Sequence, residues 1–402
     1  MKNGWQTKRL GDFAVAVSTG PFGSILHKSD YVSDGVPLVN PINIVDENLV
    51  PDQSKLISDV TKQRLSNYVL QEGDIVVARR GEIGRCAVVG PNENGWVCGT
   101  GSFFIRPLPN VDPQFLANLI RSNGYRERLE RLSTGATMKN LSNTALGDLA
   151  ISVPPLLEQR RIVGILEEAF EGIATAKANA QKNLQNAHAL FESFLQSVFA
   201  EMWKSCELVS LSELATDITD GDHLPPPKAE TGVPFITIGN INKKTRTIDF
   251  TDTFMVPHKY FNGVKANRKP KKGDVLYTVT GSFGVPVMVE DDFKFCFQRH
   301  IGLLRPKPET QSAWLYYLLL SPQVFQQANE GATGTAQKTV SLKVLRSFKV
   351  PRVSPPQQRS AVAMLDVFAS ETQRLESIYH RKLAALDGLK KSLLHRAFTG
   401  EL

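Results

Sequence analysis

The sequence predicts an α+β fold in which two similar mixed α/β globular domains are joined by two long antiparallel coiled-coil helices, with pseudo-twofold symmetry. Three observations favour this fold. The 402-residue chain repeats one plan at a nearly constant offset, each half contains many short β-branched runs, and each half ends in a long stretch with helical apolar spacing. Because one hydrophobic core rarely grows beyond about 250–300 residues, a chain of this length needs at least two.

The repeat is carried by matching segments that occur in the same order in both halves. Their offsets stay between 196 and 200 residues, which indicates a tandem duplication. The pairs are Gly-Val-Pro at 35–37 and 232–234, Gly-Asp at 73–74 and 273–274, Arg-Pro at 106–107 and 305–306, Gly-Ala-Thr at 135–137 and 331–333, and the Pro-rich segments 155–160 and 354–359.

Residues 1–155 and 206–353 are expected to form the two globular domains. Short β-branched runs broken by Gly, Pro, Asn and Asp fill both segments, as in mixed domains with several short strands. We expect strands at 75–78 and 275–279, each entering a turn that contains two glycines.

Residues 156–205 and 354–402 are expected to form the two helices. Apolar residues recur there in steps of three and four, and the helical stretches contain no proline beyond their first turns. Helices of about 40–45 residues would be about 60–65 Å long. A helix of this length buries its apolar stripe against another helix, and the nearest partner is its own duplicate, running antiparallel.

Composition narrows the functional classes. The net charge is +7, and residues 206–354 hold 19 basic against 14 acidic side chains, which permits a polyanionic partner without requiring one. The four cysteines form no C-x-x-C pair, so neither structural zinc nor a disulfide framework is predicted. Apolar runs are too short to cross a membrane and no secretory pattern is present, so we expect a cytoplasmic protein.

Searches for catalytic and metal motifs predict no such site. The Asn-Pro-Ile-Asn segment at 40–43 lacks the aromatic residue with which amino-methyltransferases stack on a flipped adenine, and no cofactor loop precedes it. The segment 331–339 does not have the glycine spacing of a phosphate-binding loop. The seven histidines form no metal-binding pattern.

Clustered basic residues on expected loops are the candidate contacts to a phosphate-bearing partner. Lys and Arg suit phosphate oxygens, and Arg also reads base edges. His223 is added because it lies in a polar, turn-rich loop that can face a partner. On charge and loop position alone, the candidate set is Arg79, Arg80, Arg85, Lys139, His223, Lys243, Lys244, Arg246, Lys265, Arg268, Lys269, Lys271 and Lys272.

The order of motifs over the whole chain resembles the DNA-specificity subunit of type I restriction-modification systems. The resemblance rests on Trp5 with Leu-Gly-Asp at 10–12, the segment 18–24, the Gly-Val-Pro and Gly-Asp motifs of both halves, Asp-Gly-Asp-His at 220–223, and the Pro-rich segments that open both helices. One departure is Gln357, which stands where the family has an acidic residue before Gln358.

The resemblance implies a non-catalytic chain whose two target-recognition domains, 1–155 and 206–353, each contact one half of a split, asymmetric DNA sequence. It implies that the helices fix the spacer and dock modification subunits, which bring S-adenosylmethionine, while motor-nuclease subunits use ATP and Mg²⁺. No cofactor is expected on this chain. The residues expected to contact partner subunits open the two helices: Glu158, Gln159, Arg160, Gln357, Gln358 and Arg359.

Two functional classes are alternatives to a DNA-specificity subunit. A self-sufficient methyltransferase or nuclease lacks support because the cofactor loop and catalytic motif are missing. A coiled-coil scaffold with two ligand-binding modules and no nucleic acid stays open, because residues 1–155 are almost neutral. The dependence of binding on salt separates this scaffold from a DNA-binding subunit.

Overall fold

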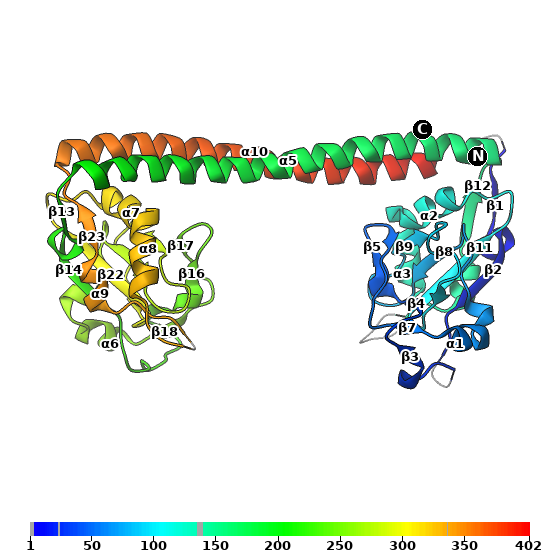
Figure 1. The fold of residues 1–402 in the computed structure, drawn as a ribbon, viewed down its shortest axis with the longest axis horizontal. Coiled ribbons are helices and arrows are strands. Elements are labelled where there is room, and N and C mark those ends of the chain that lie inside the picture. Colours follow the sequence, from blue (N-terminus) through cyan, green and yellow to red (C-terminus); the bar gives the residue numbers. More distant parts are fainter. Residues whose placement is uncertain (1–3, 23–24, 135–139, 336) are drawn as a thin grey trace. The chain divides into compact units, whose positions relative to one another are not determined.

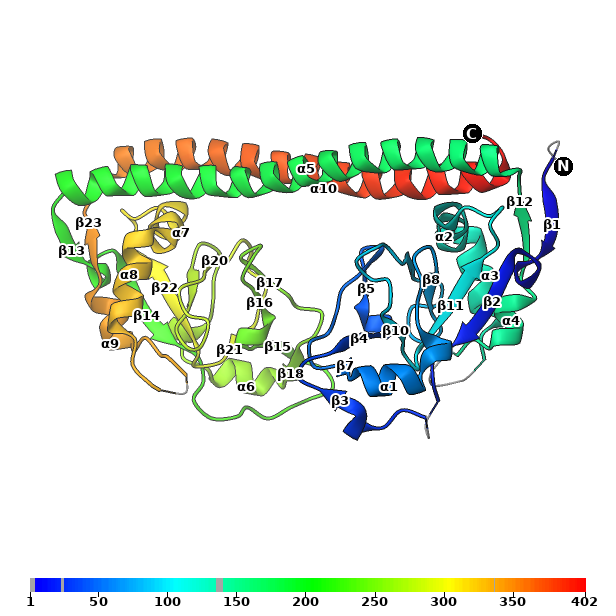
Figure 2. The same cartoon turned by 45° about the vertical axis from the view of Figure 1, so that its right-hand side comes forward.

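The computed structural model describes residues 4–22, 25–134, 140–335 and 337–402 (Figures 1 and 2). The chain divides into two compact units. Unit 1 comprises Met1–Gln181 together with Arg381–Leu402, and unit 2 comprises Lys182–His380. Each unit therefore combines one globular domain with part of both long helices. Within the described residues, no helix combines the length and apolar character that a membrane span requires.

The globular domain of unit 1 is built on a four-stranded antiparallel sheet with the order β2-β11-β8-β9. A second sheet has the order β10-β4-β7-β3, and two short ladders pair β1 with β12 and β5 with β6. The strands are β1 (Gln6–Arg9), β2 (Ala14–Thr19), β3 (Tyr31–Val32), β4 (Val36–Val39), β5 (Ile44–Val45), β6 (Asn48–Leu49), β7 (Leu56–Ile57), β8 (Ile75–Ala78), β9 (Cys86–Val88), β10 (Val97–Cys98), β11 (Ser102–Pro107) and β12 (Ala150–Val153).

Strand β8 is apolar on both faces because each face is covered. Ile75 and Val77 join a core with helices α2 (Pro113–Arg121), α3 (Asn123–Leu132) and α4 (Asn143–Gly147), whereas Val76 and Ala78 pack into a second core with β4 and β10. Side chains of a strand alternate between the two faces, so a continuous apolar run indicates a strand buried on both sides. The remaining helix of this domain, α1 (Asp59–Arg64), precedes β8.

Unit 2 repeats the strand order of the first sheet, whereas its second sheet has three strands in place of four. Its sheets run β14-β22-β19-β20 and β18-β15-β21, and its ladders pair β13 with β23 and β16 with β17. The elements are β13 (Leu208–Ser210), β14 (Ala215–Asp220), β15 (Val233–Ile236), β16 (Ile241–Asn242), β17 (Thr247–Ile248), β18 (Phe254–Val256), α6 (His258–Gly263), β19 (Val275–Thr278), β20 (Pro286–Met288), β21 (Cys296–Phe297), β22 (Ile301–Pro306), α7 (Ser312–Leu320), α8 (Pro322–Gly331), α9 (Leu342–Ser347) and β23 (Lys349–Pro351).

The two long helices are α5 (Leu156–Ser205), with 50 residues, and α10 (Pro355–Thr399), with 45. They run antiparallel within each unit. In unit 1, Lys177 Nζ lies 2.5 Å from Asp387 Oδ1. In unit 2, the rings of Phe194 and Phe368 stack with centroids 3.9 Å apart. Unit 1 also pairs Arg161 with the backbone oxygen of Leu402 at 3.1 Å, and unit 2 places His188 Nδ1 2.9 Å from Glu376 Oε1. Within each unit, higher numbers on one helix thus face lower numbers on the other, and the predicted fold class is confirmed.

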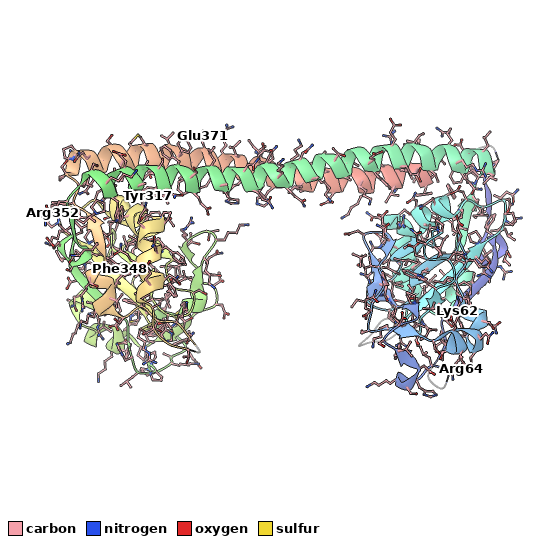
Figure 3. All side chains as sticks on the ribbon, in the orientation of Figure 1. Lys62, Arg64, Tyr317, Phe348, Arg352 and Glu371 are labelled. Atoms are coloured by element: carbon pink, nitrogen blue, oxygen red, sulfur yellow. The ribbon has the colours of Figure 1, made fainter. Side chains whose placement is uncertain are left out.

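Each globular domain packs against its own part of the helices. In unit 1, Leu394 and Ala397 of α10 complete the core around α2, and the rings of Phe398 and Phe115 meet at 5.3 Å. In unit 2, Tyr317 of α7, labelled in Figure 3, donates a 2.7 Å hydrogen bond to Asp366 Oδ1 of α10. The domains are therefore anchored to the helices by buried side chains.

Candidate nucleic-acid interface

Four loops of unit 1 meet at one end of the β2-β11-β8-β9 sheet. They follow β2, follow β8, precede β11 and precede α4. Gly20 N donates to Ser102 O at 3.1 Å, Arg79 N to Gly101 O at 3.2 Å, and Leu141 N to Arg79 O at 3.1 Å. A Cβ on Gly20 would lie 2.0 Å from Gly99 O, so the close approach of the first and third loops requires glycine there.

Unit 2 ties the equivalent loops together in the same way. A Cβ on Gly221 would lie 1.9 Å from Phe297 O. Val279 N donates to His300 O at 2.9 Å, and Val340 N donates to Val279 O at 2.8 Å. The two units thus share one loop scaffold on which different side chains are placed, and loops held by a sheet are a common site of binding residues.

The candidate residues of unit 1 differ in their surroundings. Arg79 is buried, with its Cζ 5.1 Å from the Phe22 ring centroid and 5.4 Å from that of Phe103, and its Nε donates to Asn140 Oδ1 at 3.0 Å. Burial, with the neighbouring Arg80 charge, lowers the pKa of Arg79. Arg80 is exposed, whereas Lys139 lies outside the described residues.

Arg85 is used inside unit 1. Its Nη2 donates to the backbone oxygen of Pro41, and its Nη1 lies 3.8 Å from Glu82 Oε2. Holding a backbone carbonyl of another loop is a structural task, and the expectation that Arg85 contacts DNA stays a prediction.

The first basic run of unit 2 surrounds the β16–β17 turn. Lys243 Nζ donates to Ser282 Oγ at 2.5 Å, which places this lysine beside the loop after β19. Lys244 is exposed. Arg246 adopts a positive φ of 54°. Burial raises the pKa of Tyr316, although the nearby Arg246 charge acts to lower it.

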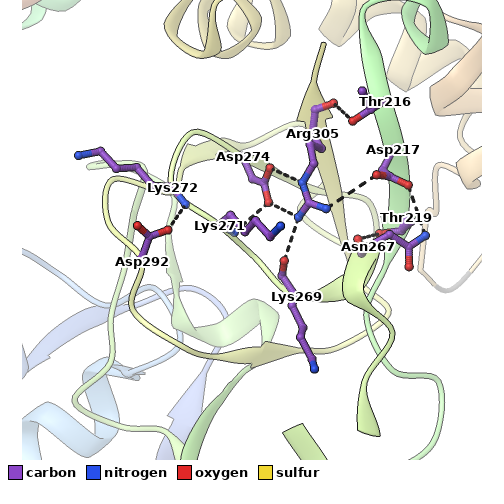
Figure 4. A network of polar contacts seen from close by, with 10 residues as sticks. All are labelled: Thr216, Asp217, Thr219, Asn267, Lys269, Lys271, Lys272, Asp274, Asp292 and Arg305. Atoms are coloured by element: carbon purple, nitrogen blue, oxygen red, sulfur yellow. Dashed lines mark hydrogen bonds and ion pairs between the residues drawn. The ribbon is translucent and has the colours of Figure 1, made fainter. Parts of the chain in front are cut away.

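The second basic run of unit 2 is held by its backbone and exposes part of its charge (Figure 4). Lys269 O accepts from Arg305 Nη2 at 2.9 Å, Lys271 N donates to Asp274 Oδ2 at 2.9 Å, and Lys272 N donates to Asp292 Oδ1 at 3.1 Å. The Lys271 and Lys272 side chains are exposed, as is that of Lys265. The Lys269 ammonium lies 5.0 Å from the Phe261 ring centroid and bonds Asn262 O.

His223 and Arg268 both pair with Asp220, and the expectation that they contact DNA stays a prediction. His223 Nε2 lies 2.7 Å from Asp220 Oδ2, and Arg268 Nη2 lies 3.2 Å from Asp220 Oδ1. Asp222 accepts a short hydrogen bond from Tyr260. Burial and this bond raise the pKa of Tyr260. The loop after β14 is therefore organised around two carboxylates.

The residues expected to contact partner subunits fall into two groups. Gln159 and Gln358 are only 1% and 2% exposed. Each accepts one backbone N–H and donates to two backbone oxygens inside its own unit, so both side chains have a structural role, and their contact with a partner stays a prediction. Arg160 and Arg359 are exposed.

The other two helix-opening residues act within their own helices. Glu158 pairs with Arg161 at 2.8 Å. Gln357 accepts from Ser354 N at 3.2 Å and Ser354 Oγ at 2.7 Å, so glutamine fulfils the capping task of an acid at this position.

The sequence did not predict two ion pairs that hold the segments before β8 and β19. Arg106 donates from Nε and Nη2 to the two oxygens of Asp74, at 2.9 and 2.7 Å, and Arg305 does the same to Asp274 at 3.0 and 2.8 Å. The four residues had served only as landmarks of the repeat. Their recurrence at a shared offset was the available signal, since two motifs retained together in both copies are candidates for contact.

A third charge cluster attaches the β5–β6 turn to α10. Glu47, at a φ of 67°, lies 3.2 Å from Arg121 Nη1 and 2.5 Å from Lys390 Nζ. Burial raises the pKa of Glu47, but Arg121 and Lys390 together bring it below its ordinary value of 4.5. The depressed pKa means that these pairs stabilise the fold above pH 4.5 and that this stabilisation is lost as pH falls through the lowered value.

We expect Glu47→Gln to weaken this attachment by no more than about 1 kcal/mol at pH 7, since the carboxylate is partly exposed. The difference from the unmodified protein should disappear in strongly acidic solution, where both carry a neutral side chain. Hydrogen exchange of the segment 44–49, corrected for its intrinsic pH dependence, measures how much the two proteins differ in stability at each pH. Asp46→Asn in the same turn is the matched control; an equal effect of both changes would contradict the assignment.

No group of three or more His, Cys, Asp or Glu that could hold a metal ion occurs among the described residues. The four cysteines are free thiols. Burial raises the pKa of Cys296 to about 12.

Comparisons with known proteins identify the family. The family model for the type I restriction modification DNA specificity domain matches residues 2–185 and 201–380. The EcoKI specificity subunit of Escherichia coli strain K12 is 23% identical over 414 residues, covering 93% of this chain and 83% of that protein. The EcoBI specificity subunit of Escherichia coli is 23% identical over 309 residues, with 69% of this chain matching 64% of that protein.

Solved structures show the same fold. A chain from a type I R-M system, described in terms of complex assembly and conformational transition, aligns with a TM-score of 0.79 and 22% identity, covering 100% of this chain and 99% of that one. The HsdS subunit from Thermoanaerobacter tengcongensis aligns with a TM-score of 0.63 and 22% identity over 100% and 98% of the two chains. Because the family model matches both halves, the chain belongs to the type I restriction modification DNA specificity family.

Proposed function

We propose that this chain is the non-catalytic, sequence-specific DNA-binding subunit of a type I restriction-modification complex. Each globular domain reads one half of a bipartite, asymmetric target in double-stranded DNA. The observation that carries this proposal is the duplicated loop scaffold. Arg79 and Arg80 of unit 1 stand where Val279 and Thr280 stand in unit 2, directly after equivalent strands, and the backbone groups of Arg79 and Val279 make equivalent hydrogen bonds. One scaffold with unlike side chains suits a reader of two unlike half-sites.

The helices α5 and α10 set the spacer between the half-sites and dock the modification subunits. In this proposal Arg160 and Arg359, which are exposed at the helix starts, are available for those subunits. S-adenosylmethionine belongs to the modification subunits, ATP and Mg²⁺ belong to the motor-nuclease subunits, and this chain holds no cofactor of its own. The assembly works in the cytoplasm, where its DNA is.

Phosphate contacts come from exposed basic side chains of the loop scaffold and the two basic runs. For each neutralised phosphate, binding releases counterions, so the logarithm of the affinity falls with the logarithm of salt concentration. The exposed members of the proposed set are Arg80, Lys243, Lys244, Lys265, Lys271 and Lys272, and the half-buried Lys269 is added to them.

The salt dependence of binding tests this function. With about five phosphates neutralised, we expect a slope of about −4 to −5 for the assembled protein on its own site. Lys244→Ala and Lys271→Ala should each make the slope shallower by about one, with little change in sequence preference. Lys8→Ala, an exposed lysine of β1, is the matched control and should keep the slope. A flat salt response would favour the scaffold without nucleic acid.

A further inference from the structure

The loop after β14 in unit 2 carries an apolar tip, which we define as residues 224–227. Leu224 is 80% exposed and is followed by three prolines. One exposed leucine is ordinary on a protein surface. The prolines extend the apolar surface, and because they lack backbone N–H groups they offer no donor to a phosphate. The tip is therefore suited to an apolar contact rather than to a polar one.

Backbone hydrogen bonds anchor the apolar tip on both sides. On the β14 side, Asp222 N donates to Phe297 O at 3.0 Å, and Arg299 N donates to Asp222 O at 3.1 Å. On the other side, Ala229 N donates to Met255 O at 2.9 Å. Because both anchors lie within two residues of the tip, its position is set by the sheets of unit 2.

The prolines also restrict the backbone of the tip from within. A proline ring fixes its own φ at about −65°. The residue before a proline is confined to extended conformations. Leu224, Pro225 and Pro226 each precede a proline, so the whole tip is held close to one extended conformation. Such a segment loses little conformational entropy when it binds.

The apolar tip belongs to the loop scaffold on which the proposed DNA contacts lie. Gly221, three residues before Leu224, is the position at which this loop closes against Phe297 O. Lys228 follows the tip directly and is exposed, with its Nζ 5.1 Å from the Phe254 ring centroid. A cation that can contact a phosphate thus stands next to the apolar surface.

We infer that Leu224 is a wedge that enters between two base pairs of the half-site bound by unit 2 and kinks the duplex there. The inference rests on the proposed function. Proteins that bend DNA insert leucine and other apolar side chains between base pairs, and the bent duplex repays the unstacking with further contacts. Pyrimidine–purine steps unstack most easily, so unit 2 should favour such a step at this place through the deformability of the DNA.

A nick in the DNA tests the wedge without changing any base. The full chain is assembled with its modification subunits. The duplex that carries its target receives one nick at a time, with the 5′-phosphate retained. For the unmodified complex, a nick at one step of one half-site should strengthen binding about three- to tenfold, because stacking at one step corresponds to about a tenfold factor. For Leu224→Ala, the same nick should change the affinity by less than about twofold.

The bend of the duplex is the second readout, measured by energy transfer between dyes at its two ends. Wedges of this kind kink DNA by about 20–90°, so Leu224→Ala should reduce the bend by about 20° or more. Leu224→Met should keep the bend and the nick effect, since methionine also serves as a wedge. Val60→Ala, which shortens a 78% exposed side chain of α1, is the matched control and should change neither.

The outcomes distinguish the wedge from the function beneath it. If the unmodified complex binds all duplexes alike, whatever their sequence, the proposed function fails. If it binds its target selectively but Leu224→Ala keeps the bend and the effect of every nick, the wedge is overturned and the function stands. Uracil in place of thymine removes only the C5 methyl group. A Leu224-dependent loss at one such uracil, with the bend unchanged, assigns Leu224 to a thymine methyl and also overturns the wedge.

Discussion

Replacing Asp274 with alanine should destabilise the globular domain of unit 2 by about 3 kcal/mol, because the change leaves one partner of a buried ion pair without its counter-charge. The Asp274 side chain is 3% exposed and that of Arg305 is 19% exposed. The carboxylate also accepts from Lys271 N at 2.9 Å, so the backbone of the second basic run loses its acceptor as well. We expect faster hydrogen exchange in β19 and β22 and in the segment 269–274.

Asp12→Asn is the control for this prediction. Asp12 pairs with Arg9 at 3.3 Å, but the two side chains are 38% and 65% exposed, so water already screens the pair and the loss should be small. Hydrogen exchange by peptide suits this chain better than a single melting curve, because two units need not unfold together. A loss below about 1 kcal/mol for Asp274→Ala would contradict the buried-pair argument.

Replacing Gln358 with leucine should cost about 2–4 kcal/mol at the start of α10, because three buried backbone groups lose their partners. The amide accepts from Gln311 N at 2.8 Å and donates to Glu309 O at 3.2 Å and Val353 O at 2.8 Å. Leucine fills similar volume, so the loss measures hydrogen bonding rather than a cavity. Exchange should rise in the first turns of α10 and in the segment before α7.

The neighbouring Gln357→Leu provides the comparison. It removes only a cap between exposed groups, for which we expect about 1 kcal/mol. Equal effects of the two changes would show that the buried position of Gln358 has no special role. Because Gln159 makes the same three contacts in unit 1, Gln159→Leu should repeat the result at the start of α5.

The repeat and the helices could be predicted because matching segments and apolar spacing are both visible in the sequence itself. Apolar spacing predicted helices of about 40–45 residues, and the structure has 50 and 45. The strand expected at 75–78 is β8, and the one expected at 275–279 ends at Thr278. Strand pairing could not be predicted from the sequence, because paired strands such as β2 and β11 are more than eighty residues apart in the chain.

The candidate interface was harder to predict because charge counts do not show which charges are paired. Lys271 and Arg268 belong to one basic run, yet Lys271 is exposed and Arg268 lies between the carboxylates of Asp220 and Asp222. These acids are more than forty positions away in the chain. The helix-opening glutamines show the same limit, because their burial depends on loops about fifty residues earlier.

Residues 381–402 complete the core of unit 1. The other part of that unit, Met1–Gln181, is synthesised much earlier. At about 5–20 residues per second, a ribosome needs roughly 10–45 s to make the intervening chain and these last residues. During that interval the nascent first domain exposes the apolar surface that Leu394, Ala397 and Phe398 later cover. Chaperone binding during translation would therefore protect the earlier-made domain until the ribosome reaches these residues.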